Sequence, residues 1–97
     1  MPTYVSLLRY AQQGIMDAKN GPARLDAAKE GFRRAGAELK GFYLTMGQYD
    51  GVAILEAPDD VTAARLALAI ATQGNLRMET LRAYPEAEYR KIIASLP

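Results

Sequence analysis

The sequence contains no cysteine and no histidine. Without cysteine the chain has no disulfide bond, no thiolate nucleophile and no thiolate metal ligand. Without histidine it lacks the commonest general base near neutral pH and the commonest metal-binding side chain. A metal would need a cluster of carboxylates, and the sequence has no Asp-x-Asp-x-Asp-Gly loop. We therefore expect neither a metal site nor a cofactor.

An excess of charge of one sign and long apolar runs are also missing. The net charge is +1 and acidic and basic residues are interspersed, which is not typical of nucleic-acid-binding proteins. No apolar run has the length of a membrane span, and the first residues show no basic leader followed by an apolar core. We therefore expect a cytoplasmic protein that binds neither nucleic acid nor membrane. The length of 97 residues fits a single domain over residues 1–97.

What the sequence does contain is an alternation of strand-like and helix-like segments. The strand-like segments are Pro2–Tyr10, Glu38–Met46, Asp50–Ala57 and Leu76–Tyr84, and the helix-like segments are Pro22–Ala35, Val61–Gln73 and a last stretch that begins at Pro85. Gly36 ends the first helix as a left-handed cap, and Asp59 caps the start of the second. The order βαββαβ with an extra C-terminal helix predicts an α+β, ferredoxin-like domain. Such a domain has one antiparallel four-stranded sheet with both long helices on one face.

The alternation of side chains along a strand assigns each residue to one of the two sheet faces. If the hairpin closes tightly around Gln48 and Tyr49, Met46 lies opposite Gly51. The face toward the helices then carries Phe42, Leu44, Met46, Ala53 and Leu55, with Val5, Leu7, Leu81 and Ala83 from the outer segments. The opposite face carries Tyr43, Thr45, Val52, Ile54 and Glu56, with Tyr4, Ser6, Leu8, Met78, Thr80 and Arg82.

This second face is too apolar to be left in water. Leu8, Val52, Ile54 and Met78 would each forfeit about 1.5–3 kcal/mol if they stayed exposed. We expect a second copy of the chain to cover it, in a homodimer or a higher homo-oligomer. Its polar side chains also suit a cavity for a small-molecule ligand, or they are polar filler at an oligomer seam. The candidate ligand-binding residues are Tyr43, Thr45, Glu56, Thr80 and Arg82.

Glu56 is the best candidate for a catalytic residue. A carboxylate that is withdrawn from water becomes a stronger base, so Glu56 in a closed interior can act as a general base. Alternatively, Glu56 forms an ion pair with Arg82 or lies open to water. The segment Gly47–Gly51, Gly-Gln-Tyr-Asp-Gly, has the composition of a turn in which Asp50 bonds to nearby amides. A catalytic role for Asp50 would need a partner that the local sequence does not supply.

The segments Gln13–Ile15, Gly41–Asp50, Glu56–Asp60 and Leu66–Tyr84, with Arg24, give the chain a resemblance to the GYD family over nearly its whole length. The resemblance implies a dimeric α/β-barrel, in which two ferredoxin-like sheets face each other across a shared interior. It implies no agreed activity, because related barrels include cofactor-free monooxygenases, dehydratase-like enzymes and haem-handling proteins. Ala11 departs from the family pattern, which implies a hydroxyl-bearing residue at this position.

Three functions are compatible with these features. The first is an uncharacterised small-molecule-binding protein or cofactor-free enzyme, with a ligand cavity between the sheets of the dimeric barrel. The second is a non-catalytic oligomeric assembly or regulatory module with no buried ligand. The third is an RNA-recognition module, which shares the βαββαβ order. Lys40-Gly41-Phe42 begins like the signature of that module, but the match then fails and lies on the wrong strand.

Overall fold

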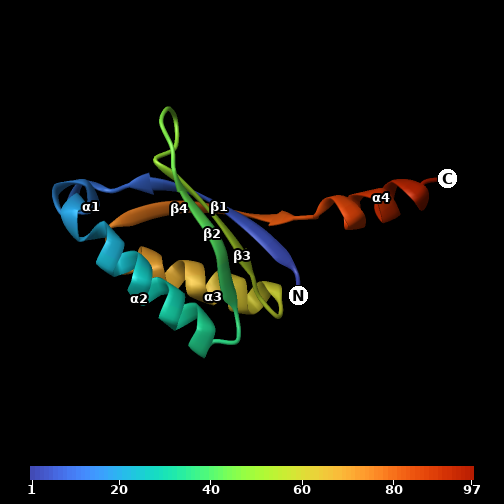
Figure 1. The fold of residues 1–97 in the computed structure, drawn as a ribbon, viewed down its shortest axis with the longest axis horizontal. Helices are drawn as coiled ribbons and strands as arrows, with labels where there is room; N and C mark the ends of the chain where they lie inside the picture. Colours follow the sequence, from blue (N-terminus) through green and yellow to red (C-terminus); the bar gives the residue numbers. More distant parts are fainter.

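The computed structural model describes residues 1–97 and consists of one antiparallel sheet with two long helices on one of its faces (Figure 1). The strands lie in the order β2-β3-β1-β4, so β3 and β1 form the centre of the sheet. The elements are β1 (Thr3–Tyr10), α1 (Gln12–Met16), the 3₁₀ turn η1 (Ala18–Asn20), α2 (Gly21–Arg34), β2 (Glu38–Leu44), β3 (Gly51–Glu56), α3 (Asp60–Ala71), β4 (Leu76–Ala83) and α4 (Glu86–Ala94). This is the predicted ferredoxin-like arrangement with an additional C-terminal helix.

The two long helices begin and end at the residues that the sequence marks as caps. The Asp59 side chain accepts a hydrogen bond from the Thr62 N–H at 2.8 Å, at the start of α3. This bond holds the pKa of Asp59 below its usual value, because it stabilises the charged carboxylate. Pro22 lies in the first turn of α2, and Gly36 follows the end of that helix with a φ of 79°. This left-handed conformation favours glycine, so both caps are confirmed.

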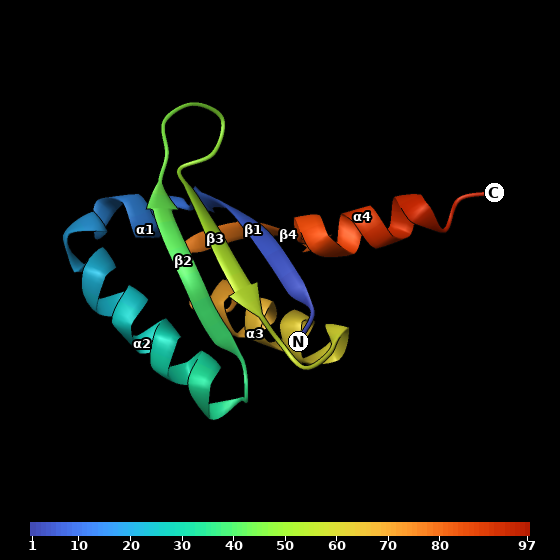
Figure 2. The same ribbon diagram turned by 45° about the vertical axis from the view of Figure 1, so that its right-hand side comes forward.

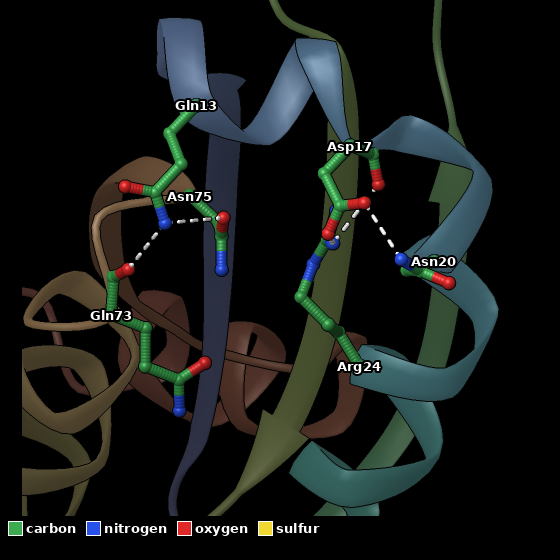
Figure 3. Close-up of polar contacts among 6 residues, drawn as sticks. All are labelled: Gln13, Asp17, Asn20, Arg24, Gln73 and Asn75. Atoms are coloured by element: carbon green, nitrogen blue, oxygen red, sulfur yellow. Dashed lines mark hydrogen bonds and ion pairs between the residues drawn. The ribbon is translucent and has the colours of Figure 1, made fainter.

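The connection between β1 and α2 contains α1, which the sequence did not reveal because the helix has only five residues and no side-chain cap. Contacts with the loop before β4 hold it in place (Figure 3). The Gln13 side-chain amide donates to the Gln73 carbonyl and to the Asn75 side chain, each at 3.1 Å. The Ala11 N–H also donates to the Asn75 carbonyl at 3.0 Å. These bonds join the start of α1 to the start of β4.

A second set of contacts joins the end of α1 to α2. The Asp17 carboxylate accepts hydrogen bonds from the Arg24 guanidinium at 2.8 Å and from the Asn20 amide at 2.7 Å (Figure 3). Arg24 also donates to the Asp17 carbonyl at 3.0 Å. Arg24 is one of the residues on which the family resemblance rests, and its observed contacts secure this connection.

Strand β1 pairs with β3 in a register that reverses the face expected for its side chains. Tyr4 lies opposite Leu55 and Ser6 lies opposite Ala53. Residues directly opposite each other share a face, so Tyr4 and Ser6 point toward the helices, where both are buried. The predicted assignment for this strand is therefore wrong. Tyr4, Ser6 and Leu8 face the helices, and Val5 and Leu7 face the open side.

Strand β4 is reversed together with β1. Thr80 lies opposite Ser6 and Arg82 lies opposite Tyr4, so both are on the helix side of the sheet and not on the open side as expected. By the same register, Met78 is on the helix side and Leu81 is on the open side. The physical cause is the lack of alternation in β1, where apolar residues occupy both phases of the strand. The apolar pattern therefore does not show which alternate residues point toward the helices. If the assignment is wrong by one residue, every side chain of the strand is placed on the other face.

The β2–β3 hairpin has the predicted faces but a longer loop. Phe42 lies opposite Ala53 and Leu44 lies opposite Gly51, so Phe42 and Leu44 are on the helix side as predicted. The strand ends at Leu44, and Met46 lies in the loop with 97% of its surface exposed. The expectation that Met46 lies opposite Gly51 is therefore wrong, because the connection is not a tight turn.

Asp50 fastens this loop to the end of β1. Its carboxylate accepts a hydrogen bond from the Tyr10 N–H at 2.9 Å, and its own N–H donates to the Leu8 carbonyl at 2.8 Å. Asp50 therefore bonds to the backbone of β1, whereas the sequence suggested amides within the turn. The segment Gly47–Gly51 is a structural connection that holds the hairpin on the central strand.

The core lies between the sheet and the helices α2 and α3. Phe32 of α2 and Ala63 of α3 pack against side chains from the buried face of the sheet. The buried cluster consists of Tyr4, Phe32, Ala37, Leu55, Ala57 and Ala63, with Leu39, Leu66 and Ile70 partly buried around it. None of the helices combines the length and the apolar character that a membrane span requires.

Gly14 in α1 has no room for a side chain. A β-carbon at this position would lie 2.0 Å from the Asn75 carbonyl oxygen. We expect Gly14→Ala to lower the free energy of unfolding in urea by about 1–3 kcal/mol, because the backbone must shift to relieve the overlap. Gly31→Ala in α2 is the control, since nothing lies within 4 Å of its added carbon. It should leave stability unchanged or raise it by up to about 1 kcal/mol. Equal effects of the two substitutions would contradict this account.

Candidate functional site

The structure divides the candidate ligand-binding residues between the two sides of the sheet. Tyr43 and Glu56 lie on the open side, Thr80 and Arg82 lie on the helix side, and Thr45 lies in the hairpin loop. The single site expected from the sequence is therefore not formed within the chain. The separation follows directly from the reversed face of β1 and β4.

The hydroxyl groups of the two candidate threonines are both used within the fold. Thr45 donates to the Tyr49 carbonyl at 2.6 Å and so stabilises the hairpin loop. The Thr80 hydroxyl lies 2.9 Å from the Ser6 hydroxyl, beneath the helices. The cavity beside this pair has a volume of about 10 Å³, which is room for about one water molecule. Neither hydroxyl is presented to a larger ligand.

Arg82 lies over aromatic rings and not beside a carboxylate. Its guanidinium carbon is 4.5 Å from the centre of the Tyr84 ring and 5.6 Å from that of Tyr4. It also donates to the Thr3 carbonyl at 3.2 Å. No ion pair joins Arg82 to Glu56, so that alternative for Glu56 is not realised. Arg82 supports the edge of the sheet through cation–π contacts.

Beside Arg82, a hydrogen bond joins the sheet to the start of α3. The buried Tyr4 hydroxyl donates to an Asp60 carboxylate oxygen at 2.5 Å. Burial raises the pKa of Tyr4 to about 12, and the bond to Asp60 adds to this effect. Asp60 lies in the first turn of α3, where a negative charge is favourable. This partly buried contact joins α3 to β1.

Glu56 lies at the end of β3 on the open side of the sheet, opposite Thr3 and Glu38. It has no ion-pair partner within 4 Å in the chain, whereas Lys40 lies 3.5 Å from Glu38. No group of three carboxylates is placed to hold a metal ion. Glu56 is accessible to a ligand or a partner, and the ionisable group that the strand pairing brings to it is the like-charged carboxylate of Glu38.

Sequence reasoning missed the role of Tyr49 in the hairpin loop. Its hydroxyl donates to Glu79 on β4 at 3.0 Å, and this bond raises the pKa of Tyr49. The Arg9 guanidinium lies 4.8 Å from the centre of its ring. The signal in the sequence was the adjacent pair Tyr49-Asp50 in the turn. The Tyr49 side chain extends across β1 to β4, and Asp50 bonds to the backbone of β1. Together these two residues hold the loop over the end of the sheet.

The open side of the sheet carries an apolar centre that no other part of the chain covers. Helices α2 and α3 lie on the opposite side in both ribbon views (Figures 1 and 2). We call this surface the open sheet face. Its apolar centre consists of Val5, Leu7, Val52, Ile54 and Leu81. A continuous apolar area of this kind is typical of an interface.

Helix α4 projects away from the rest of the chain at the end of β4 (Figures 1 and 2). The radius of gyration is 14.5 Å, above the value of about 12.5 Å expected for a compact chain of this length. One side of the helix carries an apolar stripe, with residues three, four and seven positions apart. The members of this α4 stripe are Tyr89, Ile92 and Ile93 in the helix and Leu96 two residues after its end at Ala94, with exposures of 55%, 43%, 47% and 62%.

An open groove of about 610 Å³ lies beside α2. Its lining includes Asp26, Lys29, Glu30 and Arg33 of that helix, together with the segment that leads into β2. Glu30 forms ion pairs with Arg33 and Arg34, so these charges are partly satisfied within the helix. The groove therefore has the character of a solvated helix surface.

These features define a class: an α+β ferredoxin-like domain that presents apolar surfaces rather than a deep pocket. The sequence profile described as the GYD domain matches residues 4–93 of this chain. The chain belongs to the GYD domain family, as the resemblance of its motifs indicated.

Two relatives, both from Thermus thermophilus, extend this comparison. One is named "Glutamine synthetase and cystathionine beta-lyase binding protein"; it is 32% identical over 89 residues, which are 91% of this chain and 94% of the relative. The other is the crystal structure of TTHA0845, with a TM-score of 0.55 and 25% sequence identity. That comparison covers 89% of this chain and 100% of the solved chain. The chain therefore matches both relatives over nearly their whole lengths.

The buried hydroxyl of Tyr4 should make stability depend on alkaline pH. Its pKa is raised from 10.0 to about 12, so the fold favours the neutral form. This contribution is complete below pH 10 and is lost as the pH rises toward about 12. We expect Tyr4→Phe to flatten the fall in unfolding free energy over this range, measured by urea denaturation at a series of pH values. Tyr89→Phe, at an exposed position, is the control; an equal flattening in both variants would refute the assignment to Tyr4.

Proposed function

We propose that this chain is a non-catalytic protein-binding module that associates with a metabolic enzyme, with glutamine synthetase and cystathionine beta-lyase as the partners to test first. The observation that carries the proposal is the uncovered α4 stripe, which faces solvent on a helix that projects from the sheet. The name of the Thermus thermophilus relative supports the choice of partners, because that protein matches this chain along most of its length.

The arrangement of polar residues favours binding over catalysis. Thr80 and Arg82 are separated from Tyr43 and Glu56 by the sheet itself. Acid–base catalysis requires a positioned group within hydrogen-bond reach of the reacting atom, supported by a second group that orients it or its substrate. Glu56 has no such partner among the ion pairs and hydrogen bonds of the chain.

Helix α4 has the pattern of a helix that binds in a groove. Apolar residues at positions i, i+3 and i+4 lie on one side of the helix, and the residue at i+7 follows just after its last turn. This spacing is the usual set of anchors for recognition of a helix in a groove. The helix has nine residues, and an isolated helix of this length is marginal in water. Contact with a partner would bury the α4 stripe and stabilise the helix at the same time.

Substitution of the α4 stripe should weaken binding to the enzyme. We expect Ile92→Asp or Ile93→Asp to raise the Kd at least about tenfold, the effect of removing a central apolar anchor. The measurement is biolayer interferometry with immobilised chain and each purified enzyme from the same organism. Ala87→Asp adds the same charge on the opposite side of α4 and should change the Kd little.

Two results would contradict this proposal in different ways. If neither enzyme binds the unmodified chain, the choice of partners is wrong. If an enzyme binds equally well to the Ile92→Asp and Ile93→Asp variants, α4 is not the contact element. A normal far-ultraviolet circular dichroism spectrum of each variant shows that the sheet and the other helices have formed.

We also infer that a second copy of the chain covers the open sheet face. The side chains in its centre are partly exposed in the single chain, and Leu81 is 44% exposed, so a second copy would remove their remaining apolar surface from water. A homodimer that joins the two faces buries the same residues from both copies. This arrangement agrees with the dimeric barrel implied by the family resemblance. It leaves α4 to contact the enzyme.

Ile54 lies near the middle of the open sheet face and tests the dimer directly. We expect light scattering on a sizing column to give twice the chain mass of 10.6 kDa for the unmodified protein. Ile54→Asp should give the single-chain mass, because a buried unpaired carboxylate is costly at an interface. Leu68→Asp, on the exposed side of α3, should remain dimeric. A single-chain mass for the unmodified protein at micromolar concentration would refute this part of the proposal.

A small-molecule ligand between the two faces is the second candidate function. Tyr43 and Glu56 favour it, because both lie on the open side and would line such a space. The mass measurement bears on this candidate too, since a single chain would leave both residues in water. The cytoplasmic location expected from the sequence stays a prediction.

A further inference from the structure

The open sheet face has pairs of like charges at two of its corners. Arg9 on β1 lies directly opposite Arg77 on β4. Glu38 on β2 lies directly opposite Glu56 on β3. We call these the arginine corner and the glutamate corner. Like charges that face each other across neighbouring strands destabilise a sheet, so neither pair is explained by the stability of the isolated chain.

Contacts within the chain leave both corners largely unneutralised. Neither Arg9 nor Arg77 has a carboxylate within ion-pair distance. The Arg9 guanidinium lies against the Tyr49 ring. The nearby Glu79 carboxylate accepts a hydrogen bond from the Tyr49 hydroxyl and forms no ion pair with Arg9. At the other corner, the glutamate pair has only the exposed contact of one carboxylate with Lys40, at 3.5 Å.

The two corners lie diagonally across the sheet, with the apolar centre between them. The arginine corner is on β1 and β4 at the end of the sheet near the hairpin loop. The glutamate corner is on β2 and β3 at the opposite end, level with Thr3. Arg9 is six residues beyond Thr3 along β1, which corresponds to about 20 Å in a strand. The charges are therefore well separated within one copy.

We propose that the corners set the orientation of two copies, with the arginine corner of each copy against the glutamate corner of the other. This inference rests on the proposed homodimer and adds its geometry. The two copies are related by a two-fold axis that lies between the faces and is perpendicular to the line joining the two corners of one copy. With this symmetry both corner contacts form at the same time. Such an interface is isologous, because the same surface serves both copies. The like-charged pairs then become pairs of opposite charge around an apolar centre.

This arrangement also gives the face selectivity for its partner. An apolar surface alone would pack in several orientations, since the hydrophobic effect has no direction. In other orientations, an arginine or glutamate corner would be buried against apolar residues or against a corner of the same charge. Such contacts cost free energy, whereas the proposed contact is attractive. The charges therefore select one orientation of a second copy.

Charge reversal provides the test. The first variant combines Arg9→Glu with Arg77→Glu, and the second combines Glu38→Arg with Glu56→Arg. In each variant alone, the corners that meet would carry the same sign, so we expect the dimer Kd to rise at least about 100-fold. In a mixture of the two, every contact joins opposite charges, and a heterodimer should form with a Kd within about tenfold of the original. Mass photometry or native mass spectrometry distinguishes the species.

A matched control keeps the number of reversed charges but moves them off the face. The combination of Glu86→Arg with Arg90→Glu reverses an ion pair on α4 and should leave the dimer unchanged. The heterodimer should also weaken as salt rises from 0.1 M to 1 M, because the corner contacts are partly screened. Where a double variant does not fold, the single substitutions Arg77→Glu and Glu38→Arg replace the two combinations.

The possible failures are distinguishable. If the unmodified chain is a dimer and both charge variants dimerise as tightly, the orientation proposed here is wrong while the homodimer stands. If the variants are folded single chains and their mixture gives no heterodimer, the corners do not contact each other. If the unmodified chain itself has the single-chain mass, the proposed homodimer fails together with this inference.

Discussion

The open sheet face depends on the two hydrogen bonds that Asp50 forms with the backbone of β1, one through its carboxylate and one through its N–H. Asp50 bonds to the Tyr10 N–H and to the Leu8 carbonyl, so it joins the start of β3 to the end of β1. Because β1 is a central strand, its register fixes the faces of both neighbours. With this register, the polar Ser6 and Thr80 are buried together and satisfy each other. The apolar residues that alternate with them along the strands, such as Val5 and Leu81, lie on the open sheet face.

The fold was predictable from the sequence because its segments are long and their caps are distinctive. The strand-like and helix-like segments gave the βαββαβ order, and Asp59 and Gly36 cap the helices as predicted. The hairpin faces were also correct, because Tyr43 and Glu56 alternate with apolar neighbours. The candidate site was less predictable. In β1, burial of Ser6 depends on a partner 74 residues away, which no local pattern contains.

The motifs that identify the family have structural roles in this chain. Gln13 and Arg24 hold the short helix α1, and Gly14 allows the close approach of the Asn75 carbonyl. Ala11 is the N-cap residue of α1 and makes no side-chain cap. A hydroxyl at this position can accept a hydrogen bond from the first turn, which gives a structural meaning to the implied family residue. The motifs define a scaffold, and the surfaces available for partners lie outside most of them.

The direction in which α4 leaves the sheet has a consequence for how strongly a partner is held. In the proposed dimer, each copy contributes one projecting helix, so the assembly is bivalent. If an enzyme offers two grooves at a matching separation, the second contact forms within the same complex, and its effective concentration replaces the bulk concentration. Avidity then lets a weak contact through a nine-residue helix hold an oligomeric partner firmly. A partner that offers only one groove would be bound through a single helix and would therefore dissociate quickly.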